Sequence, residues 1–244
     1  MKTNTRNWQN TVAIVGIILV LGIVPYRATA SDPDGVNASD PAVFAQNEAV
    51  VGMTYGDWSA AWWQYILSIP DSDNPLYDDG SDTNVCSVGQ SSGPVFFLAG
   101  SWVGKVTRRC TVSSVPLFFP IINAECSDIE DPPFHGSNAH ERRICAAELM
   151  DGVDVGSLEV TVDGRKVHDL EYVRVQSPDF QLTLPKDNIL GLKVTSGNAV
   201  SDGYYVMLRP LTAGDHVIHF KGACVSGVCE GFSQDITYEL TVTP

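Results

Sequence analysis

The amino-acid sequence predicts a mainly β protein, an antiparallel β-sandwich or jelly roll with one aromatic helix and one further short helix packed on it. Short segments of alternating apolar and polar residues recur in the second half of the chain, and Ile236–Val242 is the clearest. Glycine, proline and Asp-Gly pairs separate these segments, which is typical of sandwiches and jelly rolls. Two continuous apolar runs, Pro94–Trp102 and Pro116–Asn123, indicate strands covered on both faces.

The first thirty residues are typical of an export signal. Lys2 and Arg6 give a positively charged start, and Thr11–Val24 is apolar after its first residue. Residues 28–30 (Ala-Thr-Ala) then supply a cleavage pattern, so the mature chain is expected to begin at Ser31. The alternative is an uncleaved anchor, but the apolar core falls short of the ~20 residues that a spanning helix needs. We therefore expect a secreted or periplasmic protein.

The negative net charge of the chain disfavours certain classes of binding partner. Cleavage would remove three basic residues and no acidic one, which lowers the formal net charge from −14 to −17. Such a surface repels phosphate backbones and anionic lipid headgroups, so nucleic acid is not an expected partner. The remaining length suits one domain with a substantial core. We expect an N-terminal arm at residues 31–52 and a single disulfide-stapled domain at residues 53–244.

The cysteine count predicts three disulfides. An even number of cysteines behind an export signal indicates a disulfide framework, and six cysteines allow fifteen connectivities. We favour sequential pairs, because each pair then brackets one local unit: Cys86 with Cys110, Cys126 with Cys145, and Cys224 with Cys229. A metal–thiolate site is the alternative, but no CxxC motif occurs.

Thr54–Pro70 is the best helix candidate, and it carries three of the five tryptophans. Thr54 is the expected N-cap with Asp57 three residues later, and Pro70 ends the helix. At roughly 100° per residue its apolar side chains cover an arc of about 200°, wider than the ~100° that a surface helix needs. We expect this helix to cover the second face of the two apolar runs, with Trp62 as a core residue.

The remaining elements follow from local signals. Asn138–Asp151 has an N-capping asparagine and is followed by a glycine, which predicts the second helix. Asp163-Gly164 between two alternating segments predicts a hairpin with a type I′ turn. Pro120 inside the second apolar run predicts a bulge or an edge position. Further strands are expected at 171–176, 180–184, 203–208 and 216–220.

Several short motifs resemble those of a family of uncharacterised secreted microbial proteins. The motifs are Trp58-x3-Trp62-Trp63-Gln64, Asn74-Pro75-Leu76, Gly89-Gln90, Phe96–Gly100, Leu117–Pro120, Asp202–Tyr205 and His216–Phe220. The resemblance covers most of the mature chain. It implies export and a shared fold, but that family has no known activity, so it assigns no catalytic role to any residue.

Three residues are candidate ligand-binding residues. Trp63 lies at the margin of the helical apolar arc, and Trp102 follows the first apolar run. Aromatic faces of this kind can stack on the apolar faces of sugars. Glu125 closes the second apolar run beside Cys126, which makes it the first carboxylate to consider for acid–base chemistry.

Two clusters could hold metal ions. The loop between residues 71 and 82 is rich in carboxylates that could bind calcium, although it does not follow the EF-hand pattern; they are Asp71, Asp73, Asp78, Asp79 and Asp82. His135 and His140 lie at the start of the second helix near Glu141 and could bind zinc or copper. A solvated acidic loop and a capping histidine are the alternatives.

These observations favour a non-enzymatic binding or envelope-associated module, with an extracellular glycan as a candidate partner and calcium as a candidate stabilising ion. A carbohydrate-active enzyme that uses carboxylates is the first alternative. A histidine-dependent metalloprotein is the second. A serine hydrolase is disfavoured, since Gly89-Gln90-Ser91-Ser92-Gly93 matches the nucleophile-elbow letters but is followed by Pro94 and an apolar strand instead of a helix.

Overall fold

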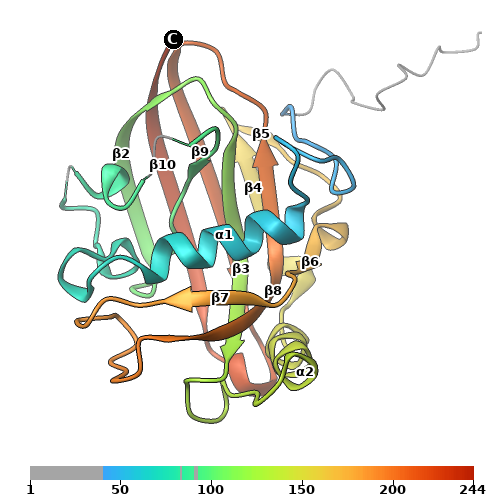
Figure 1. Ribbon diagram of the computed structural model, residues 1–244. Coiled ribbons are helices and arrows are strands. Elements are labelled where there is room, and N and C mark those ends of the chain that lie inside the picture. The colour runs from blue at the N-terminus through green and yellow to red at the C-terminus, as the bar shows by residue number, and fades with distance from the viewer. Residues whose placement is uncertain (1–40, 83, 91–92) are drawn as a thin grey trace, which may run out of the picture. The chain divides into compact units, whose positions relative to one another are not determined.

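The computed structural model describes residues 41–82, 84–90 and 93–244, and these form two five-stranded sheets and two α-helices. The expected signal at residues 1–30 lies outside the described residues, as do Ser91 and Ser92. The sandwich with two helices is therefore confirmed, and Figure 1 shows its elements. Within the described part of the chain, no helix is long and apolar enough to cross a bilayer.

The inner sheet has the order β1-β3-β8-β6, with β7 also paired to β8. Its strands are β1 (Phe96–Phe97), β3 (Leu117–Ser127), β6 (Arg174–Gln176), β7 (Phe180–Thr183) and β8 (Ser196–Leu208). The outer sheet has the order β2-β10-β9-β4-β5. Its strands are β2 (Lys105–Ser113), β4 (Glu159–Val162), β5 (Arg165–Lys166), β9 (Gly214–Ala223) and β10 (Ser233–Thr243). Most pairs are antiparallel, but β1 runs parallel to β3 and β2 parallel to β10, so both sheets are mixed.

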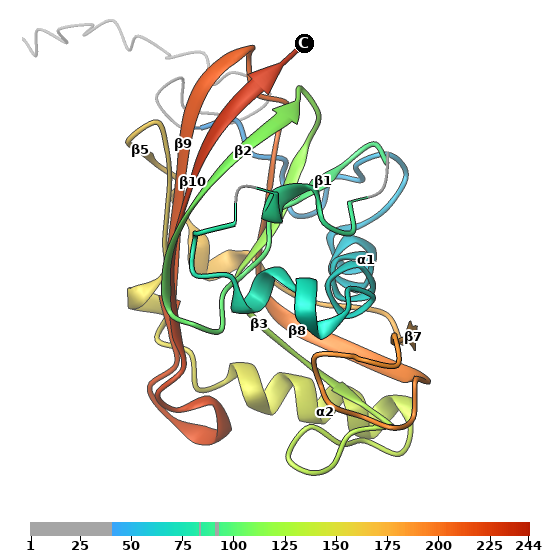
Figure 2. The ribbon, with the colours of Figure 1, turned by 90° about the vertical axis from the view of Figure 1, so that its left-hand side faces the viewer.

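The inner sheet lies between the outer sheet and helix α1 (Tyr55–Leu67), which makes three layers (Figure 2). Neighbouring residues of β3 serve both interfaces, because successive side chains of a strand point to opposite faces. Phe118 stacks on Tyr205 in the cluster under α1, whereas Phe119 stacks on Phe220 between the sheets. This double burial explains the continuous apolar run. The expected irregularity at Pro120 is present as a shift in register between Pro120 and Ile122.

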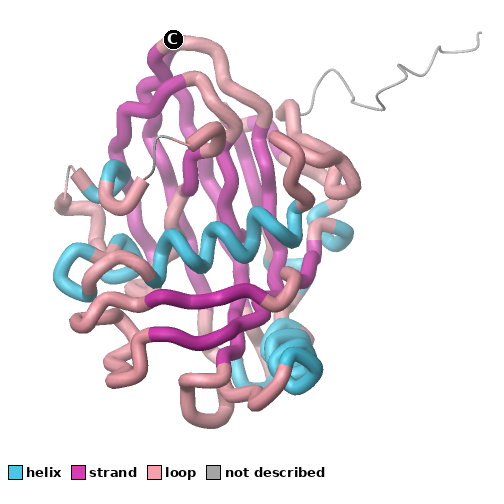
Figure 3. The backbone as a smooth tube through the Cα atoms, viewed as in Figure 1, coloured by secondary structure: helices cyan, strands magenta, loops and turns pink. Residues whose placement is uncertain are grey.

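Helix α1 begins where the sequence predicts. The Thr54 hydroxyl accepts a hydrogen bond from the Asp57 backbone N–H, and the Asp57 carboxylate accepts one from the Thr54 N–H, which is a complete capping box. The helix crosses the inner sheet (Figure 3), and Trp62 is 1% exposed with its indole N–H donating to the Leu98 carbonyl. Helix α2 (Ala139–Met150) is capped by Asn138 and packs against β3 and β8.

Three strands differ from the sequence-based expectation. In the segment Pro94–Trp102 only Phe96 and Phe97 are strand, because the carbonyls of Ala99 and Gly100 accept hydrogen bonds from Arg108 instead of from a neighbouring strand. Strand β2 was not predicted, because the fully buried Arg108 interrupts its inward-facing apolar residues. The expected strand at 171–176 also begins later, since Leu170–Tyr172 forms a 3₁₀ turn.

The three expected sequential disulfides are present. Cys86–Cys110 ties the acidic loop region to β2, and Cys126–Cys145 ties β3 to α2. Cys224–Cys229 closes the short loop between β9 and β10. Disulfides of this kind are typical of proteins in oxidising extracellular or periplasmic compartments.

Candidate functional site

Among the described residues, strand β3 has no strand partner on one edge at Asn123 and Glu125. The backbone N–H and C=O of Ser127 bond to Phe134 and Gly136, away from β8, whereas the Asp128 N–H bonds to Asn198 beyond the end of β8's pairing with β3. Because residues alternate between the two edges of a strand, Asn123 and Glu125 also direct their backbone groups away from β8. Strand β1 pairs with β3 only at Leu117 and Phe118. No other described residue forms a hydrogen bond with the outward backbone groups of Asn123 and Glu125.

A pocket with a volume of about 340 Å³ lies at this edge, and we call it the edge pocket. Its walls include Trp63 of α1, Trp102, Glu125 of β3, and Glu130, Phe134 and Phe232 from loops. The three residues expected from sequence to bind a ligand, Trp63, Trp102 and Glu125, thus line the same pocket although they are far apart in the chain. The segments that bring them together are the helix layer, the β1–β2 connection and the inner sheet.

The aromatic residues of the edge pocket differ in exposure. Trp63 is 6% exposed, lies edge-on against Trp62, and forms part of the pocket floor. Trp102 is 38% exposed and rests edge-to-face on Tyr77, with ring centroids 5.4 Å apart. Phe134 is 41% exposed on the loop that follows β3. The rim therefore offers aromatic surface to a ligand, whereas the floor belongs to the core.

The edge pocket contains a pair of carboxyl groups. Glu125 is 5% exposed, and desolvation by burial, with the nearby Glu130 carboxyl as a second cause, raises its pKa well above the ordinary 4.5. Burial also raises the pKa of Glu130, although hydrogen bonds from Glu125 and Ser127 oppose that shift. Burial therefore makes both carboxyl groups hold a proton more tightly than an exposed glutamate does.

The Glu130 side chain is held by the strand end. Its carboxylate accepts a hydrogen bond of 2.7 Å from the Ser127 hydroxyl, and its backbone carbonyl lies 2.8 Å from Nδ1 of His135. Glu125 has less support, because its Oε2 atom is buried and finds no hydrogen-bond donor in the described part of the chain. A buried acceptor without a donor costs free energy, so the arrangement favours a ligand that supplies the missing hydrogen bond.

Two buried acids in one pocket can bind a ligand or take part in acid–base chemistry. Glycosidases use such a pair, with the two carboxyl groups about 5–10 Å apart so that a sugar or a water fits between them. In the edge pocket the Glu130 carboxyl contributes to the raised pKa of Glu125, so the two groups influence each other. The arrangement can bind a ligand that carries hydrogen-bond donors or a positive charge, and it can take up or release a proton when it does so.

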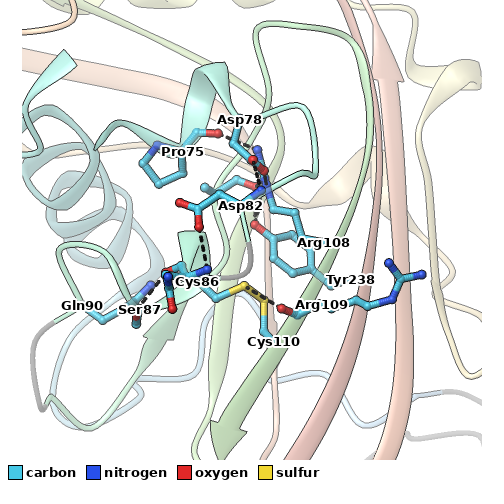
Figure 4. The surroundings of a disulfide bond; sticks show 12 residues. Pro75, Asp78, Asp82, Cys86, Ser87, Gln90, Arg108, Arg109, Cys110 and Tyr238 are labelled. Carbon is cyan, nitrogen blue, oxygen red and sulfur yellow. Dashed lines mark hydrogen bonds and ion pairs between the residues drawn. A yellow bond between two sulfur atoms is a disulfide. The ribbon is translucent and has the colours of Figure 1, made fainter. Parts of the chain in front are cut away.

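The acidic loop uses its aspartates for other contacts. Asp78 forms an ion pair of 3.0 Å with the buried Arg108, which also donates to Pro75, Ala99, Gly100 and Tyr238, as Figure 4 shows in part. Asp79 and Asp82 accept from the backbone of Ser81 and Asn84. Asp71 and Asp73 lie in an exposed 3₁₀ turn. Among residues 41–244, outside the three that the structure leaves undescribed, no group of three carboxylate, histidine or cysteine side chains is placed to hold a metal ion.

The histidines also lie apart. His135 places its two ring nitrogens near the Glu130 carbonyl and the Ser137 hydroxyl, and His140 is exposed on the first turn of α2. Glu141 accepts from the backbone N–H of Ser137 and the side chain of Asn138. Glu141 therefore stabilises the helix start, and His135 joins the loop after β3 to Ser137.

A second hollow lies on the exposed face of the outer sheet, with a volume of about 460 Å³. Its polar side chains already have partners. Arg109 forms an ion pair of 2.7 Å with Glu239, and Thr241 donates to Asp215 at 2.9 Å. No buried atom there lacks a hydrogen bond among the described side chains, so the edge pocket is the stronger candidate.

Sequence patterns did not indicate Glu130, Phe134 and Phe232. They reach the edge pocket from loops, whose course does not follow from periodicity. The position of Glu130 gave one signal for a second acid near Glu125. It follows Glu125 by five residues and lies just after strand β3, which contains the apolar run.

Comparison with known proteins gives no functional assignment. No family model matches the chain, and no curated protein matches it. A solved structure with some likeness is a cysteine protease inhibitor from Entamoeba histolytica. It is 11% identical, the match covers 57% of this chain and 95% of the inhibitor, and the TM-score is 0.20. At a TM-score this low the likeness has no bearing on function.

Proposed function

We propose that this protein is an exported, non-enzymatic binding module whose ligand site is the edge pocket. The observation that carries the proposal is the convergence of Trp63, Trp102 and Glu125 on one pocket that also contains the buried, donorless Oε2 of Glu125. Ligand pockets typically combine apolar walls with a few converging polar groups. The pocket offers aromatic surface at its rim and hydrogen-bond acceptors at its floor.

Export belongs to the proposal as well. The basic, apolar and small-residue segments of residues 1–30 match a cleavable signal peptide, and the resemblance to secreted microbial proteins points the same way. The three disulfides support an oxidising destination. Mass spectrometry of the protein purified from the culture medium or periplasm should find an N-terminus at Ser31, and an intact Met1 would contradict this part of the proposal.

A screen by two-dimensional ¹H–¹⁵N NMR tests the binding function. The probes are a panel of neutral and acidic oligosaccharides and a panel of short peptides, and the readout is the pair of indole N–H signals of Trp63 and Trp102. We expect at least one panel to shift both signals together. Trp102→Ala should abolish the response of the Trp63 signal, whereas Tyr172→Ala, which removes an exposed aromatic residue outside the pocket, should preserve it.

The results of this screen distinguish a binding module from a carbohydrate-active enzyme. If neither panel shifts the two indole signals, the edge pocket is not a ligand site. Release of reducing sugar from any oligosaccharide by the wild-type protein, with loss of that activity in Glu125→Gln, would instead support the carbohydrate-active enzyme. A non-enzymatic binding module predicts no such activity.

A further inference from the structure

The open edge of β3 presents groups that a peptide backbone matches. Asn123 and Glu125 each direct an N–H and a C=O toward the edge pocket, on the side away from β8. These groups recur every second residue, at a spacing of about 7 Å, which is the spacing of the complementary groups on an extended chain. An added strand would satisfy them, as in other complexes formed by strand addition. A sugar has no such regular alternation of donors and acceptors.

The unpaired stretch of the β3 edge at Asn123 and Glu125, which we call the opening, is bounded at both ends. The Gln234 side chain donates to the Ile121 carbonyl before it, and Phe134 and Gly136 pair with Ser127 after it. The residues between these contacts leave room for about three residues of an extended partner, or roughly 10 Å. Beyond that length the partner must leave the edge, so the site fits a short extended segment and does not fit a long strand.

The two sides of the opening have different chemistry. Glu125 and Trp63 lie on the side of β3 that faces α1, where the floor is acidic and aromatic. Ala124 belongs to the opposite face, with Leu149, Met150 and Phe232 around it in the cluster between the sheets. Because side chains of an added strand alternate in the same way, a partner would place one residue against the acidic side and its neighbour against the apolar side.

Charge specifies the residue on the acidic side. The pocket walls contain Glu125, Glu130 and Glu230 and no lysine, arginine or histidine among the described residues that line it. The whole chain carries a formal charge of −14, so a second copy would bring like charge to the same place. A lysine or arginine would supply the donors that the buried Glu125 Oε2 lacks among its described neighbours.

We propose that the edge pocket binds a short extended peptide segment with adjacent basic and apolar residues, added as a strand to the free edge of β3. The basic side chain contacts Glu125 and Glu130, and the apolar side chain enters the space lined by Leu149, Met150 and Phe232. This inference rests on the proposed function, since it names the ligand class of the same pocket.

The test uses a mixture of acetylated, amidated pentapeptides of the form Ser-B-Z-B-Ser, where B is arginine or lysine and Z is valine, leucine, isoleucine or phenylalanine. A matched mixture carries glutamine at both B positions. Isothermal titration calorimetry with the purified protein should give affinity for the basic mixture and at least tenfold weaker affinity for the glutamine mixture. Glu125→Gln should weaken binding of the basic mixture at least tenfold, whereas Glu239→Gln, on the outer sheet, should leave it unchanged.

Methylation of the peptide backbone distinguishes strand addition from other modes. One peptide set carries N-methyl groups at both B residues and another at Z only. If the peptide is an added strand, its N–H groups alternate between β3 and solvent, so one set should lose binding at least tenfold and the other should retain it. Equal effects of the two sets, or no effect of either, would overturn the inference.

The remaining outcomes separate this inference from the proposed function. If oligosaccharides shift the Trp63 and Trp102 indole signals and the basic peptides bind nowhere, the peptide inference is wrong and the binding function stands. If a second copy of the chain occupies the edge, size-exclusion chromatography will show a concentration-dependent dimer that Trp102→Ala disrupts, and the peptide inference again fails. If neither oligosaccharides nor peptides perturb the pocket, the proposed binding function and the peptide inference are both wrong.

Discussion

Glu125 combines three properties that rarely occur together in a stable core. It is buried, its Oε2 lacks a donor among the described residues, and its neighbour Glu130 is another acid. The charged form is costly in such a place, so burial raises the pKa and the folded protein retains a proton that the unfolded chain would release. This residue therefore links folding to protonation at the proposed ligand site.

Glu125→Gln should make stability less dependent on pH. Because the pKa of Glu125 is raised in the folded state, its contribution to stability is complete below its ordinary pKa of 4.5 and is lost as the pH rises through the folded-state value. Between about pH 5 and about pH 8 the free energy of unfolding of the wild type should therefore fall more steeply than that of the variant. Urea unfolding across this range measures both slopes.

Glu230→Gln is the control, because Glu230 lines the same pocket but lies nearer its solvent-exposed rim. It should leave the slope of the wild type unchanged. Identical slopes for wild type and Glu125→Gln would mean that folding does not raise the pKa of Glu125.

At the scale of single residues, the sequence predicted part of the lining of the candidate site. Trp63 was marked by its place at the margin of the helical arc and Glu125 by its position at the end of an apolar strand. Glu130 carried only a weak signal, its spacing from Glu125, because its position depends on how the loop after β3 turns back to place His135 and Phe134 near the strand end. The acidic composition of the loop at residues 71–82 was misleading, since Asp78 is a partner of the buried Arg108.

For helix α1, the sequence predicted both the helix and its packing over the apolar strands. Its aromatic arc is wide because it packs on the inner sheet and also against residues outside that sheet, such as Val50 and Leu76. Strand β2 shows the opposite case, because one buried arginine at an inward position hides its alternation. Local patterns thus predict elements whose burial is purely apolar, and they fail where a polar side chain is buried with distant partners such as Tyr238.

Trp62→Ala should destabilise the protein by about 3–5 kcal/mol, because it removes a fully buried side chain and its hydrogen bond to Leu98. Trp102→Ala should cost about 1 kcal/mol or less, since Trp102 is partly exposed and its main aromatic contact is Tyr77. Chemical denaturation of both variants compares the two costs. A Trp62→Ala protein with wild-type stability would show that α1 is a recognition surface and not part of the core.

The disulfides determine how the layers are held around the edge pocket. Cys126–Cys145 fixes α2 against β3, and α2 supplies Leu149 and Met150 to the pocket wall. The double variant Cys126→Ser with Cys145→Ser opens a link between residues 19 positions apart and should cost about 3 kcal/mol. Opening Cys224–Cys229, whose sequence separation is 5, should cost about 2 kcal/mol. Thermal unfolding compares the two, and a larger loss from the second pair would contradict this ordering.

At the scale of the whole molecule, the protein is a β-sandwich covered by helix α1. One edge of strand β3 has no strand partner among the described residues at Asn123 and Glu125. Sequence patterns predicted the layers and the covalent links, because both follow from local spacing. They did not predict the opening, since it arises where β1 ends after two residues and the loop after β3 returns only at Ser127.

Hydrogen exchange of the β3 amides tests this opening most directly. The amides of Ile122 and Ala124 point toward β8, whereas those of Asn123 and Glu125 point into the edge pocket. Under native conditions we expect the amides of Asn123 and Glu125 to exchange at least about tenfold faster than those of Ile122 and Ala124, and to become protected when a peptide binds. Uniform protection from Ile122 to Cys126 in the free protein would show that the edge of β3 is already paired, and would contradict its role as a binding edge.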